Sequence, residues 1–232
     1  GFITGKVNVG SVTWMPDSSG IAYLAKREGD ETRALYRIPL GGGESRVIAK
    51  LKSDIRAFSL SPDGRQLLLR WSAHHTPPQL AVQPVAGGEA RKLTDTRSAD
   101  FKSRTWLAPQ TVEVPSTHGA GTVWAKLYRP AQLEAGRKYP IVMFVHGAGY
   151  LQNVSDRYPN YFREQMFHNL LVQKGYIVLD MDYRGSEGYG RDWRTAIYRN
   201  MGHPELEDYK DGLDWLVDTQ QGDRDHAGIY GG

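Results

Sequence analysis

The chain has 232 residues, 40% of them hydrophobic and 24% charged, so it is long enough to bury the core of one domain or two. It contains no cysteine, which excludes disulfide bonds, thiolate zinc sites and a cysteine nucleophile. The formal charge of +3 is small and no Lys/Arg stripe is present, so the sequence does not support nucleic-acid binding.

A repeat occupies the first hundred residues. Pro16-Asp17 recurs 46 residues later as Pro62-Asp63, and Glu44 of a glycine-rich segment recurs 45 residues later as Glu89. Each unit reads as four short strands joined by Pro-Asp and Gly-Gly turns, a pattern typical of a β-propeller blade of about 45 residues. Two unrelated β-meanders are the alternative. Because two blades do not close a ring, we expect further blades to precede residue 1.

The segment at 97–103 is the predicted crossing between domains, which places residues 1–103 in the blades and 104–232 in a second domain. A hairpin at 110–130, turning at His118 to Gly121, opens that domain. Buried strands are then predicted at 139–145, within 176–186 and at 227–230, and helices at 161–174, 191–201 and 205–218. This alternation predicts a mainly parallel sheet with helices on both faces.

Apolar periodicity predicts which helix faces lie inside. The apolar row of the helix at 161–174 is Phe162, Met166 and Leu170, with Phe167 and Leu171 beside it. The inner stripe of the helix at 205–218 is Leu206, Tyr209, Leu213 and Leu216, with its acidic side chains facing water.

A glycine-rich segment follows each predicted buried strand. The first, H-G-A-G at 146–149, presents backbone N–H groups at the carboxyl edge of the sheet, where α/β-hydrolases place one oxyanion-hole donor. The second holds Arg184 and Gly185. Its glycine spacing is not that of a nucleotide-binding loop, and we interpret it as an active-site loop tied down by Arg184. The third, Gly231 and Gly232, is typical of the start of the G-x-S-x-G nucleophile elbow.

These motifs together resemble the prolyl oligopeptidase family of serine peptidases, in particular its dipeptidyl peptidase IV-like and acylaminoacyl peptidase-like branches. The resemblance rests on the S-P-D-G blades, Y-P-I-V-M-F-V-H-G-A-G, D-Y-R-G-S-E-G-Y-G and the final I-Y-G-G. It implies the last blades of a β-propeller followed by the first half of an α/β-hydrolase domain. The nucleophile is expected directly after Gly232, and the rest of the Ser-His-Asp triad later still. We therefore expect the 232-residue chain alone to be inactive.

The resemblance also assigns the oxyanion hole. His146, Gly147 and Ala148 match the H-G-G-P pattern of acylaminoacyl peptidases, which selects the Ala148 N–H as the donor, and Tyr150 adds a further contact in the active-site loop. The histidine itself has an alternative role as a structural hydrogen-bonding residue. The intact protein is then expected to hydrolyse short peptides. An α/β-hydrolase esterase and a non-catalytic interaction protein are the alternatives.

No cofactor or metal is expected, and the sequence has neither H-E-x-x-H nor an acidic calcium loop. No apolar stretch is long enough for a membrane span, and no signal peptide is visible. The sequence leaves open the compartment of a soluble protein (cytoplasm, periplasm or secreted), and it leaves open whether the intact protein forms a homo-oligomer.

Overall fold

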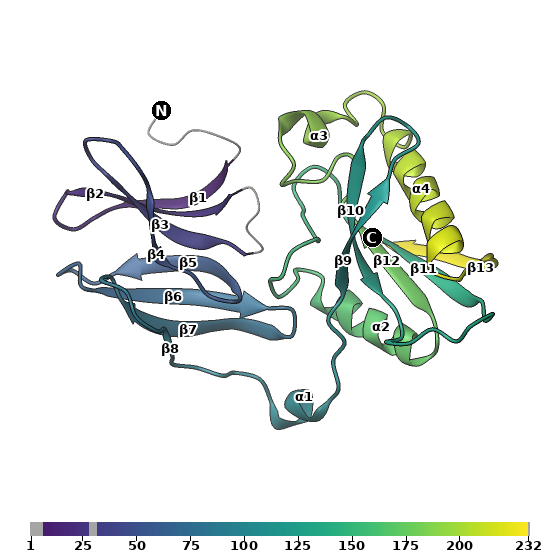
Figure 1. Ribbon diagram of the computed structural model, residues 1–232, viewed down its shortest axis with the longest axis horizontal. Coiled ribbons are helices and arrows are strands. Elements are labelled where there is room, and N and C mark those ends of the chain that lie inside the picture. The colour runs from purple at the N-terminus through teal and green to yellow at the C-terminus, as the bar shows by residue number, and fades with distance from the viewer. Residues whose placement is uncertain (1–6, 28–31, 232) are drawn as a thin grey trace. The chain divides into compact units, whose positions relative to one another are not determined.

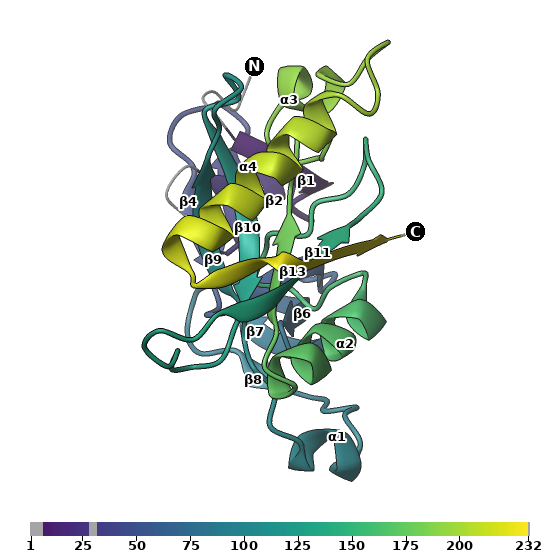
Figure 2. The same cartoon turned by 90° about the vertical axis from the view of Figure 1, so that its right-hand side faces the viewer.

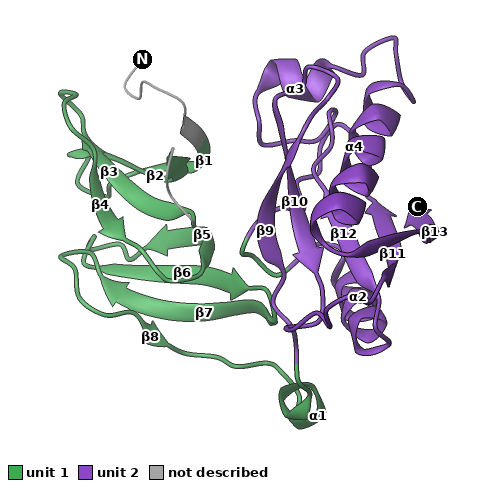
Figure 3. Ribbon diagram, turned by 45° about the vertical axis from the view of Figure 1, so that its right-hand side comes forward, with its two compact units in different colours: residues 1–105, 156–158 green, residues 106–155, 159–232 purple. Residues whose placement is uncertain are grey.

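The computed structural model describes residues 7–27 and 32–231 and divides into two compact units (Figure 3). Unit 1 comprises Gly1–Thr105 and Asp156–Tyr158, and unit 2 comprises Trp106–Ser155 and Pro159–Gly232. The segment predicted to cross between domains contains a short helix, α1 (Ala99–Ser103), whose N-cap Ser98 accepts a hydrogen bond from the Phe101 amide.

Unit 1 consists of two four-stranded antiparallel sheets, each with its strands in sequence order (Figure 1). The first sheet contains β1 (Val7–Trp14), β2 (Gly20–Arg27), β3 (Ala34–Pro39) and β4 (Arg46–Ala49). The second contains β5 (Asp54–Leu60), β6 (Gln66–Ala73), β7 (Thr76–Pro84) and β8 (Arg91–Lys92). Each sequence repeat thus forms one sheet, as predicted. Among the described residues the sheets do not close into a ring, so the β-propeller stays a prediction.

The repeated Pro-Asp turns have the same local structure in both sheets. Asp17 accepts a hydrogen bond from the Ser19 amide, and Asp63 accepts one from the Arg65 amide, each at 3.0 Å. A carboxylate that accepts from the amide two residues later fixes the turn between the first two strands. A shared apolar cluster that includes Leu24, Ile55 and other side chains of both sheets then packs them together.

Unit 2 is built on a five-stranded mixed sheet with the order β13-β11-β12-β10-β9. Its strands are β9 (Gln110–Pro115), β10 (Thr122–Tyr128), β11 (Tyr139–Val145), β12 (Ile177–Met181) and β13 (Gly222–Gly231). The predicted hairpin is β9–β10, and β11 is parallel to both β12 and β13. The strands expected to be buried at 139–145 and near 177 occupy the middle of the sheet, and β12 is buried throughout.

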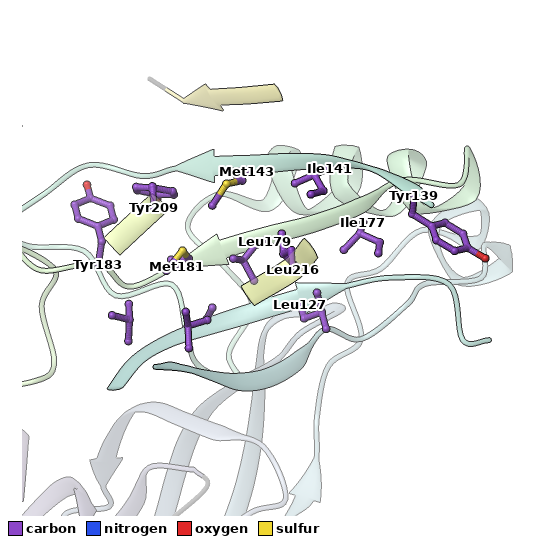
Figure 4. Packing of buried hydrophobic residues seen from close by; sticks show 13 residues of the cluster. Leu127, Tyr139, Ile141, Met143, Ile177, Leu179, Met181, Tyr183, Tyr209 and Leu216 are labelled. Atoms are coloured by element: carbon purple, nitrogen blue, oxygen red, sulfur yellow. The ribbon is translucent and has the colours of Figure 1, made fainter. Parts of the chain in front are cut away.

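Helices cover both faces of this sheet. Figure 2 shows α2 (Phe162–Gln173) and α4 (Pro204–Thr219) on opposite sides of it. Leu179 and Met181 face α4, where Gly212 leaves room for them, and belong to the apolar cluster shown in Figure 4. Side chains of a strand alternate between faces, so Asp180 points to the other side, toward α2.

The α2 prediction named the wrong inner face. Its buried side chains are Gln165, His168 and Asn169, whereas Phe162, Phe167 and Leu170 of the predicted apolar rows are exposed. The reason is that the sheet face beneath α2 is itself polar and aromatic, with buried Lys126, Asp180 and Tyr128. Polar groups buried there need polar partners, and Tyr128 donates to Gln165 at 3.3 Å.

The α4 prediction was right for Tyr209 and Leu216, which are buried, and wrong for Leu206, which is 59% exposed. The expectation that its acidic side chains face water was also wrong in part, since Asp208 and Asp211 are buried. Asp211 accepts hydrogen bonds from both the amide (2.9 Å) and the hydroxyl (2.6 Å) of Thr117 in the β9–β10 turn. Turn and loop donors therefore hold these carboxylates inside.

Two further elements differ from expectation. The helix predicted at 191–201 is only α3 (Arg191–Thr195), followed by turns in which Arg199 takes a left-handed conformation (φ 56°). The strand predicted at 227–230 lies in the sheet, paired with β11, but is not buried, and Ile229 is 62% exposed. Among the described residues β13 is an edge strand, and a strand with one neighbour keeps much of its surface in water.

Candidate active site

Two loops and one strand end meet at one edge of the unit 2 sheet, where β11, β12 and β13 end. Residues 146–149 follow β11, residues 182–185 follow β12, and Gly231 is the last residue of β13. The register pairs Val145 with Gly231, so the residue before the H-G-A-G loop lies beside the end of β13. The carboxyl ends of parallel strands are where open α/β sheets bind their ligands.

The amides of the H-G-A-G loop differ in what they contact. The Gly147 amide donates to the Tyr161 hydroxyl at 3.2 Å, and the Gly149 amide donates to the Gly185 carbonyl at 2.5 Å. The half-buried Ala148 makes no hydrogen bond through its amide with any residue that the structure describes. Of these three consecutive donors, Ala148 is thus the one left to interact with a ligand.

His146 is buried, and each of its ring nitrogens lies next to an acceptor. Nδ1 is 2.9 Å from the Gly147 carbonyl oxygen, and Nε2 is 3.1 Å from an Asp182 carboxylate oxygen. Only the doubly protonated ring donates to both. Burial lowers the pKa of His146, but the hydrogen bond to Asp182 and the charges of Asp182 and Asp180 outweigh it and raise the pKa above 6.5.

Asp182 accepts hydrogen bonds from three donors besides His146, and these donors lie in two segments of the chain. The Asn153 amide donates at 2.7 Å, the Val154 amide at 3.0 Å and the Tyr189 hydroxyl at 2.7 Å. The Asp182 side chain is fully buried. A buried carboxylate is stable when donors of this kind satisfy both of its oxygens.

A second buried carboxylate, Asp180, lies two residues before Asp182, on β12. Both of its oxygens accept from the Asn153 side-chain amide at 3.1 Å. Burial raises the pKa of Asp180 to about 6, although the nearby charge of Lys126 lowers it. Asn153 therefore joins the two carboxylates, its side chain bonding Asp180 and its amide bonding Asp182.

The predicted active-site loop after β12 is attached to α4. The Arg184 amide and Nε donate to Asp208 at 2.6 and 2.9 Å, and the guanidinium also contacts Glu207 at 2.7 Å. Gly185 has φ 108°, and a Cβ there would lie 3.0 Å from Ile197. The Arg184 side chain is thus engaged within unit 2 as an anchor for the loop.

Tyr150 follows the H-G-A-G loop and is 77% exposed. At the other end of the site, a Cβ on Gly231 would lie 2.2 Å from the Val145 carbonyl oxygen, so only glycine fits this contact. Gly232 lies outside the described residues, and the nucleophile elbow stays a prediction.

Sequence reasoning missed Asp182, Asn153, Tyr161 and Tyr189, which hold the loop in place. One signal was present: the predicted buried strand contains two acids, Asp180 and Asp182, in an otherwise apolar run. Buried acids require partners, so this pattern indicated a polar network without identifying the residues that complete it.

Comparison with known proteins shows what the chain is similar to. Residues 162–232 match the Prolyl oligopeptidase family. The chain is 27% identical over 220 residues to the uncharacterized peptidase YuxL of Bacillus subtilis, covering 94% of this chain and 32% of that protein. It is 27% identical to dipeptidyl-peptidase 5 of Porphyromonas gingivalis, over 97% of this chain and 31% of that protein. Human dipeptidyl peptidase 8 is 36% identical over 129 residues, which are 54% of this chain and 14% of that protein.

Dipeptidyl peptidase 4 of Porphyromonas gingivalis has the same fold over 99% of this chain and 32% of its own length, with a TM-score of 0.81 and 22% identity. The chain thus spans about a third of the length of the first two relatives and of this structure. These matches confirm the resemblance predicted from the motifs.

Proposed function

We propose that the chain is part of a serine peptidase of the prolyl oligopeptidase family, whose model matches residues 162–232, and that the intact protein acts on short peptides. The relatives named dipeptidyl peptidases support this reaction class. The observation that carries the proposal is the Ala148 amide, which has no hydrogen-bond partner among the described residues and lies at the sheet edge where β11 and β13 end side by side. In this proposal, unit 1 supplies the last blades of a β-propeller and unit 2 supplies the first half of an α/β-hydrolase domain.

In the proposed mechanism the Ala148 N–H belongs to the oxyanion hole. A serine directly after Gly232 attacks the peptide carbonyl, activated by a histidine that an aspartate orients, both from outside this chain. The carbonyl oxygen becomes negatively charged, and Ala148 donates a hydrogen bond to it together with the amide after the serine. A fixed donor of this kind contributes about 10²–10³ in kcat.

The test removes the donor and keeps the loop. In the complete gene product Ala148→Pro deletes the N–H, whereas Ala148→Gly keeps it and serves as the matched control. Ala148 is not among the described residues with positive φ, so its φ does not exclude proline. We expect Ala148→Pro to lower kcat on a peptide anilide by about 10²–10³ and Ala148→Gly to change it little. Equal kcat values for the two variants contradict the proposed role.

A comparison of substrates tests the reaction class. The complete gene product is expected to turn over a peptide anilide in preference to a simple nitrophenyl ester. Strong preference for the ester supports the esterase alternative instead. An absence of both activities and of labelling by a fluorophosphonate supports the non-catalytic alternative.

A further inference from the structure

The direction of the Ala148 N–H is determined by the carbonyl on the other side of the same peptide bond. The peptide unit is planar and trans, so the Gly147 C=O and the Ala148 N–H point in opposite directions. His146 Nδ1 donates to the Gly147 oxygen at 2.9 Å. Holding this oxygen therefore holds the amide that the proposed mechanism uses.

The position of the His146 ring is in turn determined by its surroundings. Its Nε2 bonds Asp182 at 3.1 Å, and its ring packs against Tyr183 with a centroid separation of 4.9 Å. The Tyr183 hydroxyl also donates to the His146 carbonyl. The imidazole is enclosed, because its side chain is fully buried.

Asp182 does not depend on His146 for its own position. Two backbone amides, those of Asn153 and Val154, and the Tyr189 hydroxyl hold its two oxygens at 2.7–3.0 Å. These donors come from the loop before α2 and the loop before α3. The carboxylate is thus a fixed point to which the H-G-A-G loop is attached through one histidine.

We propose that Asp182 and His146 are positioning residues that aim the Ala148 N–H at the developing oxyanion. The chain of contacts runs from the Asp182 carboxylate through the His146 ring to the Gly147 carbonyl. This inference rests on the proposed function of the Ala148 amide.

The chain offers a matched control for a merely structural role. Asp211 is also a buried carboxylate of unit 2 that accepts hydrogen bonds from a turn, namely from Thr117 and His118. None of its described contacts reaches the H-G-A-G loop. Asp182→Asn and Asp211→Asn each replace a carboxylate by an amide, and the N–H groups of the new amide face hydrogen-bond donors instead of acceptors. Only Asp182 belongs to the chain of contacts that leads through His146 to Ala148.

The experiment measures kcat and KM of the complete gene product on a peptide anilide. We expect Asp182→Asn to lower kcat about 100-fold, as for an amide displaced by about 1 Å, with KM changed less than about threefold. Asp211→Asn is expected to keep kcat within about threefold, even if it lowers the melting temperature. His146→Gln is expected to act like Asp182→Asn, and the double variant to be no worse than either single one, because both break the same chain of contacts.

The inference is overturned if Asp182→Asn and Asp211→Asn have the same kcat, or if the two positioning variants have multiplicative effects. Should Asp182→Asn fail to fold, Tyr189→Phe removes one of its hydrogen bonds more mildly. It is expected to lower kcat about fivefold, and an unchanged kcat then counts against the inference. A normal kcat in Ala148→Pro instead refutes the proposed donor itself, so the two failures are distinguishable.

Discussion

Replacing Gly231 by alanine tests the contact between the end of β13 and the start of the H-G-A-G loop. A Cβ on Gly231 would lie 2.2 Å from the Val145 carbonyl oxygen and 3.0 Å from its Cβ. Since a backbone oxygen cannot rotate away, the strands have to separate until that contact reaches at least 3.0 Å. Overpacking of this kind costs about 1–3 kcal/mol, which exceeds the 0.4–1 kcal/mol that alanine gains by restricting the unfolded chain.

The same displacement moves the residue directly before His146. A shift approaching 1 Å in a catalytic loop lowers kcat about 100-fold. The control is Gly228→Ala on the same strand, where the new Cβ meets nothing within 4 Å. We expect the control to be neutral or slightly stabilising and to keep its kcat.

The assay compares melting temperature and kcat of the two variants in the complete gene product. The contact is refuted if Gly231→Ala and Gly228→Ala melt at the same temperature. A lower melting temperature with an unchanged kcat refutes only the link between this strand end and catalysis.

Two further predictions concern the unit 2 core. Leu216→Ala removes a fully buried side chain and is expected to lower the free energy of unfolding by about 2–5 kcal/mol. Leu206→Ala, at an exposed site of the same helix, is expected to lower it by less than about 0.5 kcal/mol. Denaturant unfolding measures both values. Burial raises the pKa of Asp180 to about 6 in the folded protein, compared with 3.8 in the unfolded chain. Between these two pH values the folded protein binds a proton that the unfolded chain has released. The free energy of unfolding therefore falls as pH rises from about 4 to about 6. Asp180→Asn is expected to flatten the pH dependence of stability between about pH 4 and 6, and parallel curves for parent and variant contradict this reasoning.

The sequence predicted best those elements whose signals are local. Pro16-Asp17 and Pro62-Asp63 mark turns whose hydrogen bonds close within a few residues, so the sheets of unit 1 followed from their repeat. The apolar run at 139–145 identified a central strand because burial on both faces leaves few polar positions.

Predictions that depend on distant partners were weaker. The buried face of α2 contains His168 because the facing strands present polar and aromatic groups, and Tyr230 of β13 hydrogen-bonds to it at 2.7 Å. No periodicity within the helix contains that information, so apolar counting placed Leu170 inside and it is exposed. The edge position of β13 likewise depends on which strands lie beside it.

In the candidate site too, the features with local signals were predicted and those that depend on distant partners were not. The glycines of the H-G-A-G loop identified where free amides could lie, but which amide stays free was decided by Tyr161 and Gly185, far along the chain. Each accepts a hydrogen bond from an amide next to Ala148, and among the described residues the Ala148 amide has no such partner. A loop with all its amides free would move among several arrangements, whereas this one has the flanking donors bound and its peptide carbonyl held by His146. In the proposed arrangement, the buried Asp182 directly after β12 is the support that lets a short glycine-rich loop hold a single direction for one N–H.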